Sequence, residues 1–292
     1  MSKYIVYTYQ FAPLIRKDED VPSLFKDYGI VSRDDIMRDK QKIFGAIFDA
    51  DSGFVFSDGS QTFHHKELLN TGGVIVLRIA NNKTIIQEKN FTLNKIPNNP
   101  SCIVVIDNRT DCQSIAIQQN GKSFSSTDNV ANILKKSFNA FLRPKGLLLD
   151  IRRRFSEQSF WQIVDKHTEG IKSIKFRFAR PNLPRVSDNI GEALAAIGKN
   201  LNASTTYELT AVDGGTLNLS KDDLALASLV KAAGDSGYPI SILPAKKDAS
   251  RLYSGKSSHI VIELPGSVSD EQEDLLFNHS FEDISSTMNE FK

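Results

Sequence analysis

Residues 102–118, CIVVIDNRTDCQSIAIQ, place two runs of mostly apolar, β-branched residues on either side of a polar four-residue turn. This pattern is typical of an antiparallel hairpin. If Asp107 faces Cys112, then Cys102 faces Ile117, and the two thiols lie about five residues apart along the strands. That separation predicts two free cysteines, as expected in a reducing cytoplasm, and neither cysteine belongs to a C-x-x-C pair that would suggest a zinc site.

Before this hairpin, the chain combines short β-like segments with one helix. The run Tyr4 to Phe11 contains no Gly or Pro and alternates aromatic residues, which predicts a first strand that ends at Pro13. Apolar residues recur at helical spacing between Ile36 and Phe48 and predict a helix. Further strands are predicted at residues 54–56, 62–68, 74–79 and 84–93. Together these elements predict a sheet-rich N-terminal domain with one helix, residues 1–125.

The pattern changes after a polar break that ends near Thr127. A helix is predicted behind Thr127-Asp128, and the segments Leu147 to Phe155, Ser156 to His167 and Ile171 to Ala179 predict one β-α-β unit. The remaining predicted elements are a helix at 190–201, a hairpin about 213–215, a helix at 220–234, and strands at 240–243 and 259–264. We therefore expect a C-terminal α/β sandwich-like domain, residues 126–266, and an acidic helical tail, residues 267–292. The predicted fold class is α+β, with mostly antiparallel sheets, helices on one face and two domains.

The composition is typical of a soluble globular protein. Of the 292 residues 40% are hydrophobic, and 36 Lys and Arg nearly balance 35 Asp and Glu, which argues against disorder. No uncharged apolar run approaches the ~20 residues of a membrane-spanning helix, and the first residues lack the apolar stretch of a secretory signal. We therefore expect a cytoplasmic protein without direct membrane insertion.

The near-neutral total conceals two charged regions. Arg143 to Arg185 contains eleven Lys or Arg against four acidic residues, a net charge of +7, whereas Glu263 to Lys292 contains eight acidic residues against one lysine, a net charge of −7. Such asymmetry is typical of a polyanion-binding surface or of an acidic interaction tail. Two solvated faces, or the pairing of the two regions with each other, would explain it equally well.

Strand alternation predicts where the basic side chains of the β-α-β unit point. Arg152 and Arg154 share one face of the first strand, Lys175 and Arg177 share one face of the second, and the crossover helix covers the apolar face. The four cations would meet on the open sheet face and repel each other unless a counter-charge arrives. The phosphate backbone of double-stranded DNA would supply that charge whatever the base sequence. The predicted nucleic-acid-binding residues are Arg152, Arg153, Arg154, Lys172, Lys175, Arg177, Arg180 and Arg185.

Two other functions remain open. A metal-dependent nuclease would use Asp107 and Asp111, although the following strand lacks a Glu-x-Lys pattern and an Asx-turn explains both aspartates more simply. A protein-binding scaffold or inhibitor would use the acidic tail, Asp270 to Glu290, which is also an alternative cover for the basic face. His64 and His65 are adjacent and point to opposite faces of a strand, so no shared metal site is predicted. No catalytic residue and no cofactor is predicted.

The order of the predicted elements resembles the prophage-encoded phage-exclusion family RexA. The resemblance is one of layout and length, and the segments that carry it are Tyr4 to Tyr9, Ile103 to Ile117, the helix at Thr127-Asp128, Arg152 to Arg154, Lys175 to Arg180, and Ile190 to Leu201. It implies a dimeric, two-domain protein that binds double-stranded DNA without marked sequence preference and takes part in bacterial defence against phage. RexA-like proteins act with a membrane partner protein, and no motif in this sequence identifies such a partner.

Overall fold

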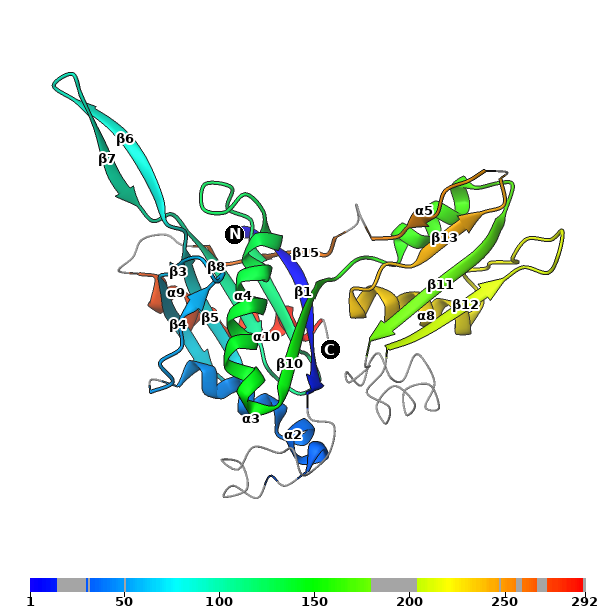
Figure 1. The fold of residues 1–292 in the computed structure, drawn as a ribbon, viewed down its shortest axis with the longest axis horizontal. Coiled ribbons are helices and arrows are strands. Elements are labelled where there is room, and N and C mark those ends of the chain that lie inside the picture. Colours follow the sequence, from blue (N-terminus) through cyan, green and yellow to red (C-terminus); the bar gives the residue numbers. More distant parts are fainter. Residues whose placement is uncertain are drawn as a thin grey trace. The chain divides into compact units, whose positions relative to one another are not determined.

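The structure is a computed structural model in which two compact units can be distinguished (Figure 1). Unit 1 comprises residues 1–5, 13–151 and 261–292, and unit 2 comprises residues 6–12 and 152–260. Antiparallel strand pairs and helices occur in both units, which confirms the α+β class. The division differs from the predicted boundary at residues 125–126, because the chain that follows the hairpin still belongs to unit 1. The structure describes residues 1–14, 30, 32–49, 51–179, 204–246, 248–255, 259–266 and 272–290.

The largest sheet has seven strands in the order β10-β1-β9-β8-β5-β4, with β15 also paired to β1. The hydroxyl of Tyr4 in β1 donates a hydrogen bond to the carbonyl of Pro265, just after β15, at 2.6 Å. Because β1 and β15 pair from Ser2↔Leu264 to Ile5↔Val261, segments near both ends of the chain share one sheet. The strands are β1 (Ser2–Pro13), β4 (His65–Thr71), β5 (Val74–Ala80), β8 (Ser101–Asp107), β9 (Ser114–Gln118), β10 (Leu147–Arg153) and β15 (Val261–Leu264).

The predicted hairpin forms as β8 and β9, but in a different register. Val104, and not Cys102, pairs with Ile117. The connection between the strands is therefore longer than predicted, and Cys112 lies inside it, fully buried. Both cysteines are free, as predicted.

Helices cover both faces of the large sheet. α4 (Thr127–Leu142) begins at Ser126, whose hydroxyl accepts a hydrogen bond from the backbone N–H of Asn129. Figure 1 shows α4 on one face and α10 (Phe281–Asn289) on the other, where α9 (Glu273–His279) packs against β4. The tail that was predicted as a separate element is therefore part of unit 1. The shorter elements are α2 (Arg33–Arg38), α3 (Lys40–Gly45), η2 (Ala46–Phe48), β2 (Phe56–Ser57), β3 (Thr62–Phe63) and η3 (Arg143–Lys145).

A two-stranded hairpin of unit 1, which we call the arm, extends from the large sheet (Figure 1). It consists of β6 (Lys83–Lys89) and β7 (Thr92–Asn98), which pair antiparallel and form a sheet of their own. The prediction of a single strand at 84–93 is therefore wrong. The reason is that the turn between the strands is Asn90-Phe91, which lacks the glycine that usually marks a two-residue hairpin turn.

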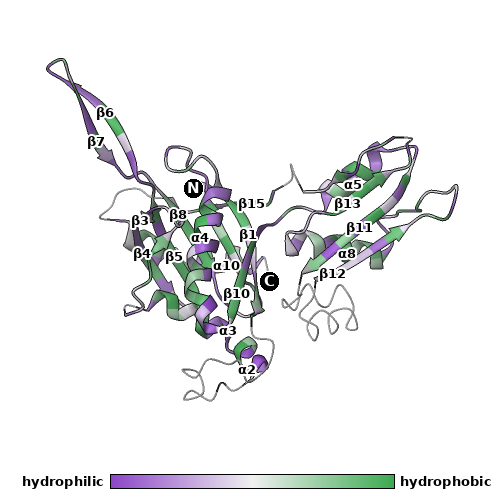
Figure 2. Ribbon diagram, in the orientation of Figure 1, coloured by the Kyte–Doolittle hydropathy of each residue, from purple (hydrophilic) through white to green (hydrophobic). Residues whose placement is uncertain are grey.

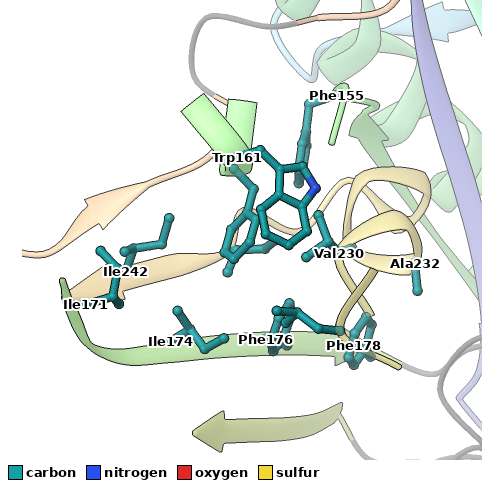
Figure 3. Packing of buried hydrophobic residues seen from close by; sticks show 13 residues of the cluster. Phe155, Trp161, Ile171, Ile174, Phe176, Phe178, Val230, Ala232 and Ile242 are labelled. Atoms are coloured by element: carbon teal, nitrogen blue, oxygen red, sulfur yellow. The ribbon is translucent and has the colours of Figure 1, made fainter. Parts of the chain in front are cut away.

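Unit 2 contains a four-stranded sheet in the order β12-β11-β13-β14, with antiparallel neighbours throughout. The helices α5 (Gln158–Lys166) and α8 (Leu224–Ser236) pack on one face, as predicted. Figure 3 shows Phe176 and Phe178 of β11 near Val230 of α8 and Trp161 of α5 in this buried cluster. The strands are β11 (Ile171–Ala179), β12 (Ser204–Thr210), β13 (Ser241–Pro244) and β14 (Leu252–Tyr253).

The predicted β-α-β unit is wrong in its strand pairing. β10 lies next to β1 in the seven-stranded sheet, whereas β11 belongs to the four-stranded sheet. β1 is buried along most of its length, and just after β10 the backbone N–H of Arg154 donates to the carbonyl of Val6 at 3.0 Å, so the chain stays beside β1. The predicted strand at 259–264 is realised as β15 of the large sheet, and the predicted helix at 190–201 lies outside the described residues.

Candidate nucleic-acid interface

One face of the four-stranded sheet carries polar side chains. Along β11, Ile174, Phe176 and Phe178 are buried against α5 and α8. Because successive side chains of a strand alternate, Lys175 and Arg177 point to the opposite face. We call this side the open face, because among the described residues Arg177 is exposed on it and Lys175 is half-buried.

Three charged residues form an ion-pair network on the open face. The ammonium of Lys175 lies 2.9 Å from the carboxylate of Glu208, and the guanidinium of Arg251 lies 3.3 Å from the same carboxylate. The hydrogen bond from Lys175 is the main cause that holds the pKa of Glu208 below its usual value. Two cations share one carboxylate, so the network keeps a net positive charge, and its side chains are 34% to 39% exposed.

Arg152 and Arg177 meet at the ring of Tyr238. The guanidinium carbon of Arg152 lies 3.8 Å from the ring centroid, and that of Arg177 lies 5.8 Å from it. A guanidinium over an aromatic face is held by the ring quadrupole and can still donate hydrogen bonds from its edge. The structure therefore brings these two predicted residues together. They meet at an aromatic ring, although their strands, β10 and β11, do not pair.

Arg153 and Arg154 are placed differently from the prediction. Arg154 is only 5% exposed, and its guanidinium forms an ion pair with Asp235, itself 6% exposed, near the end of α8. The guanidinium of Arg153 donates to the hydroxyl of Tyr7 at 3.3 Å and lies 5.7 Å from the centre of that ring. Arg152 and Arg154 both contact residues at the end of α8, Tyr238 and Asp235, so the side that was predicted to be open is covered at Arg154. Arg154 is a structural residue of unit 2.

The six predicted residues that the structure describes do not form one cluster. Lys175 and Arg177 lie on the open face, Arg152 joins Arg177 at Tyr238, and Lys172 is exposed near the start of β11. Arg180 and Arg185 lie outside the described residues.

The sequence did not predict a place in this site for three residues of the region. Arg251 lies in an irregular segment before β14, with no periodic neighbour to indicate its direction, and it reaches Glu208, 43 positions away in the sequence. Tyr253 pairs with Ser241, which pairs with Lys175, so its ring points to the open face, where it is 45% exposed. Tyr238 follows the glycine that ends α8 and gave no sequence signal for a contact with two arginines.

The charge of the chain is divided between the units. Residues 152–260 contain sixteen Lys and Arg against eleven Asp and Glu, and residues 6–12 contain none, so unit 2 carries +5. Since the whole chain carries +1, unit 1 carries −4. The positive charge therefore belongs to the unit that contains the open face.

The acidic tail uses its apolar side inside unit 1. Phe277, Ile284 and Met288 are fully buried, and the thiol of Cys112 donates to the carbonyl of Met288 at 3.3 Å. The acidic residues Glu282, Asp283 and Glu290 of the tail are exposed. The apolar side of the tail is therefore used for packing inside unit 1.

Asp107 has a structural environment. Its side chain is fully buried, and its carboxylate accepts hydrogen bonds from the backbone N–H of Arg109 at 3.1 Å and from Nε of the same residue at 2.9 Å. The backbone contact is the Asx-turn bond expected from the sequence. The guanidinium of Arg109 also donates to the hydroxyl of Ser285 in α10 at 3.2 Å, which ties the β8-β9 turn to the tail. Asp107 is therefore buried beneath this contact, where a metal-bound water could not reach it.

His65 and His167 contact groups of their own surroundings. The ring of His65 lies 4.9 Å from that of Phe56, and burial lowers the pKa of this histidine. His167 ends α5, with Nδ1 2.7 Å from the carbonyl of Ile163. Within the described ranges, no group of three or more His, Cys, Asp and Glu side chains is arranged to hold a metal ion.

In the part of the chain that the structure describes, no helix combines the length and apolar character needed to cross a bilayer. No protein-family model, no curated protein and no solved structure matches the chain.

Proposed function

We propose that this protein binds double-stranded DNA through the phosphate backbone, without reading the base sequence and without catalysis. The observation that carries the proposal is the open face of the four-stranded sheet, where Lys175 and Arg251 share the carboxylate of Glu208 and Arg177 lies exposed beside Tyr238. Lys and Arg side chains that outnumber the carboxylates around them bind phosphates by releasing counterions. The net charge of +5 on unit 2 adds a long-range attraction for a polyanion.

The arrangement of the side chains favours positioning on the backbone over base readout. Lys175, Arg177 and Arg251 present N–H donors on flexible side chains of the open face, and Arg152 of β10 lies beside them at Tyr238. Base readout in a groove requires a helix or ribbon that enters the groove. The open face is therefore suited to phosphate contacts.

The test is the salt dependence of binding to a duplex of about 30 base pairs. The variant Lys175→Gln/Arg177→Gln removes two cations from the open face, and the control Lys166→Gln/Lys231→Gln removes two exposed lysines from α5 and α8, which cover the other face. Each lost phosphate contact lowers the slope of log K against log salt by about 0.9, so the first variant should lose about 1.8. The control should keep the slope. Equal slopes in both variants, or no binding at low salt, would contradict the proposal.

The layout resemblance to RexA supports a biological context. We propose that the protein acts in the bacterial cytoplasm as a homo-oligomer, in defence against phage or within a mobile element, together with a partner protein. Light scattering of the purified chain tests the oligomer, and plaque counts on cells that express the wild type or Lys175→Gln/Arg177→Gln test the defence. Equal plating efficiency with wild type and with an empty vector, over a panel of phages, would contradict the proposed role in defence. DNA binding is tested separately, by the salt slope.

A further inference from the structure

The arm has almost no packing support from the rest of unit 1. Every residue of β6 is exposed, and within β7 only Ile96 and Asn98 are partly covered. A lone two-stranded ribbon is marginally stable in water. The arm nevertheless keeps apolar side chains in solvent: Ile85 is 48% exposed, Ile86 66% and Leu93 68%. Figure 2 shows hydrophobic and hydrophilic stretches along the arm.

The tip of the arm carries a phenylalanine in a conformation that suits glycine. Asn90 and Phe91 form the turn with φ of +53° and +59°. Both angles are in the left-handed region, where asparagine is tolerated and a bulky side chain is strained. Phe91 is also 99% exposed, so no packing within the described residues compensates the strain. A strained and fully exposed aromatic residue at the end of a projecting element indicates contact with a partner.

The charge of the arm identifies the kind of partner. The arm contains one acidic residue, Glu88, and three lysines, Lys83, Lys89 and Lys95. Its net charge is therefore +2, whereas unit 1 as a whole has a net charge of −4. Lys89 immediately precedes the turn, and Lys95 pairs across the ribbon with Ile86. Two arms of two copies that packed together would bring these lysines close to each other, whereas a polyanion would neutralise them.

We propose that the arm is a second DNA contact, in which β6 and β7 enter a groove and Phe91 inserts between base pairs. Two-stranded ribbons fit DNA grooves, and apolar wedges at the end of such elements unstack base steps and bend the duplex. The arm lysines contact the phosphates on either side of the groove. This inference rests on the proposed function, because the wedge would add to the contacts with the DNA phosphates that the proposal assigns to the open face of unit 2.

The experiment compares Phe91→Gly, Phe91→Trp and the wild type on a duplex with a dye at each end and 2-aminopurine within it. Glycine suits the turn and relieves its strain, so Phe91→Gly keeps the arm folded while it removes the wedge. We expect wild-type protein and Phe91→Trp to bend the duplex and raise the 2-aminopurine signal. Phe91→Gly should do neither, should bind about tenfold more weakly, and should keep the salt slope, because stacking is not an ionic contact.

The outcomes separate this inference from the proposed function. If Phe91→Gly bends and binds DNA as the wild type does, while Lys175→Gln/Arg177→Gln loses its slope, the arm inference is wrong and the proposed function stands. If the wild type does not bind DNA, both are wrong. If Phe91→Gly turns a dimer into a monomer in light scattering without a change in DNA bending, the partner of the arm is a second copy and the inference is overturned.

Discussion

The buried ion pair between Arg154 and Asp235 gives the sharpest test of how this chain uses its arginines. Arg154 is 5% exposed and Asp235 6% exposed, so the variant Asp235→Asn leaves a guanidinium charge inside unit 2 without its carboxylate. Breaking one partner of a buried pair costs about 3–5 kcal/mol. For a unit of this size, with a urea m-value of about 2 kcal/mol/M, the unfolding midpoint should fall by about 2 M.

Tryptophan fluorescence measures this change in unit 2 alone. The chain has a single tryptophan, Trp161, which is 7% exposed in the core of that unit. The matched control is Asp165→Asn, because its pair with Lys221, at 3.1 Å, has side chains 61% and 58% exposed. An exposed pair contributes less than about 1 kcal/mol, so the control should move the midpoint by less than about 0.5 M.

Two results would refute the reasoning about Arg154. The first is a midpoint of Asp235→Asn that moves no further than that of the control. The second is a loss of about 0.9 in the salt slope of DNA binding for Arg154→Gln without a loss of stability, which would make Arg154 a phosphate contact. The apolar replacement Arg154→Met/Asp235→Leu should restore most of the stability, since a packed apolar pair avoids the desolvation of two charges.

Further predictions follow from single residues. Gly237→Ala should lower the free energy of unfolding by more than about 1 kcal/mol in urea titrations, because Gly237 has φ +70° and a Cβ would lie 2.6 Å from Cβ of Arg152; an unchanged midpoint would contradict this. Burial raises the pKa of Cys102 to about 12, so a thiol reagent at mildly basic pH should label this cysteine only after unfolding, and rapid labelling of the native protein would count against it. Hydrogen bonds from Ser60 are the main cause that lowers the pKa of Asp58 from 3.8 to about 2. This carboxylate therefore favours the folded state above pH 3.8 and loses that effect as the pH falls toward 2, and carboxyl NMR should give a midpoint near 2 and not near 3.8.

Local signals in the sequence predicted the elements well where side chains near in sequence make the structure. Ser126 caps α4, and Asp223 caps α8 by accepting from the backbone N–H groups of Ala225 and Leu226. A cap and its donors are two or three residues apart, so a helix start is a local signal. The start of α4 agrees with the prediction, whereas α8 begins at Leu224, because its cap is Asp223 and not Ser220. The turn of the arm was missed because Asn90-Phe91 lacks the usual glycine.

Pairing between distant strands could not be predicted in the same way. β10 and β11 are separated by one short helix, which predicts neighbours, yet β10 pairs with β1 from the start of the chain. The periodicity of a strand gives the direction of its side chains but contains no information about which strand lies beside it. The pairing of β15 with β1 could not be predicted either, because it joins Ser2 to Leu264, which lie far apart in the sequence.

The difference between local side-chain direction and long-range strand pairing explains why only part of the predicted site forms. The direction of Lys175 depends on β11 alone, and alternation placed it correctly on the open face. What Lys175 meets there depends on the neighbouring strand, and Glu208 of β12 neutralises part of its charge. Arg154 required an uncovered face, and it does not have one, because α8 brings Asp235 against it. The number of basic residues in a segment therefore overstates the charge available to a polyanion. The cations that our proposal assigns to phosphate binding are those whose carboxylate partner is shared, as at Glu208, or replaced by a ring, as at Tyr238.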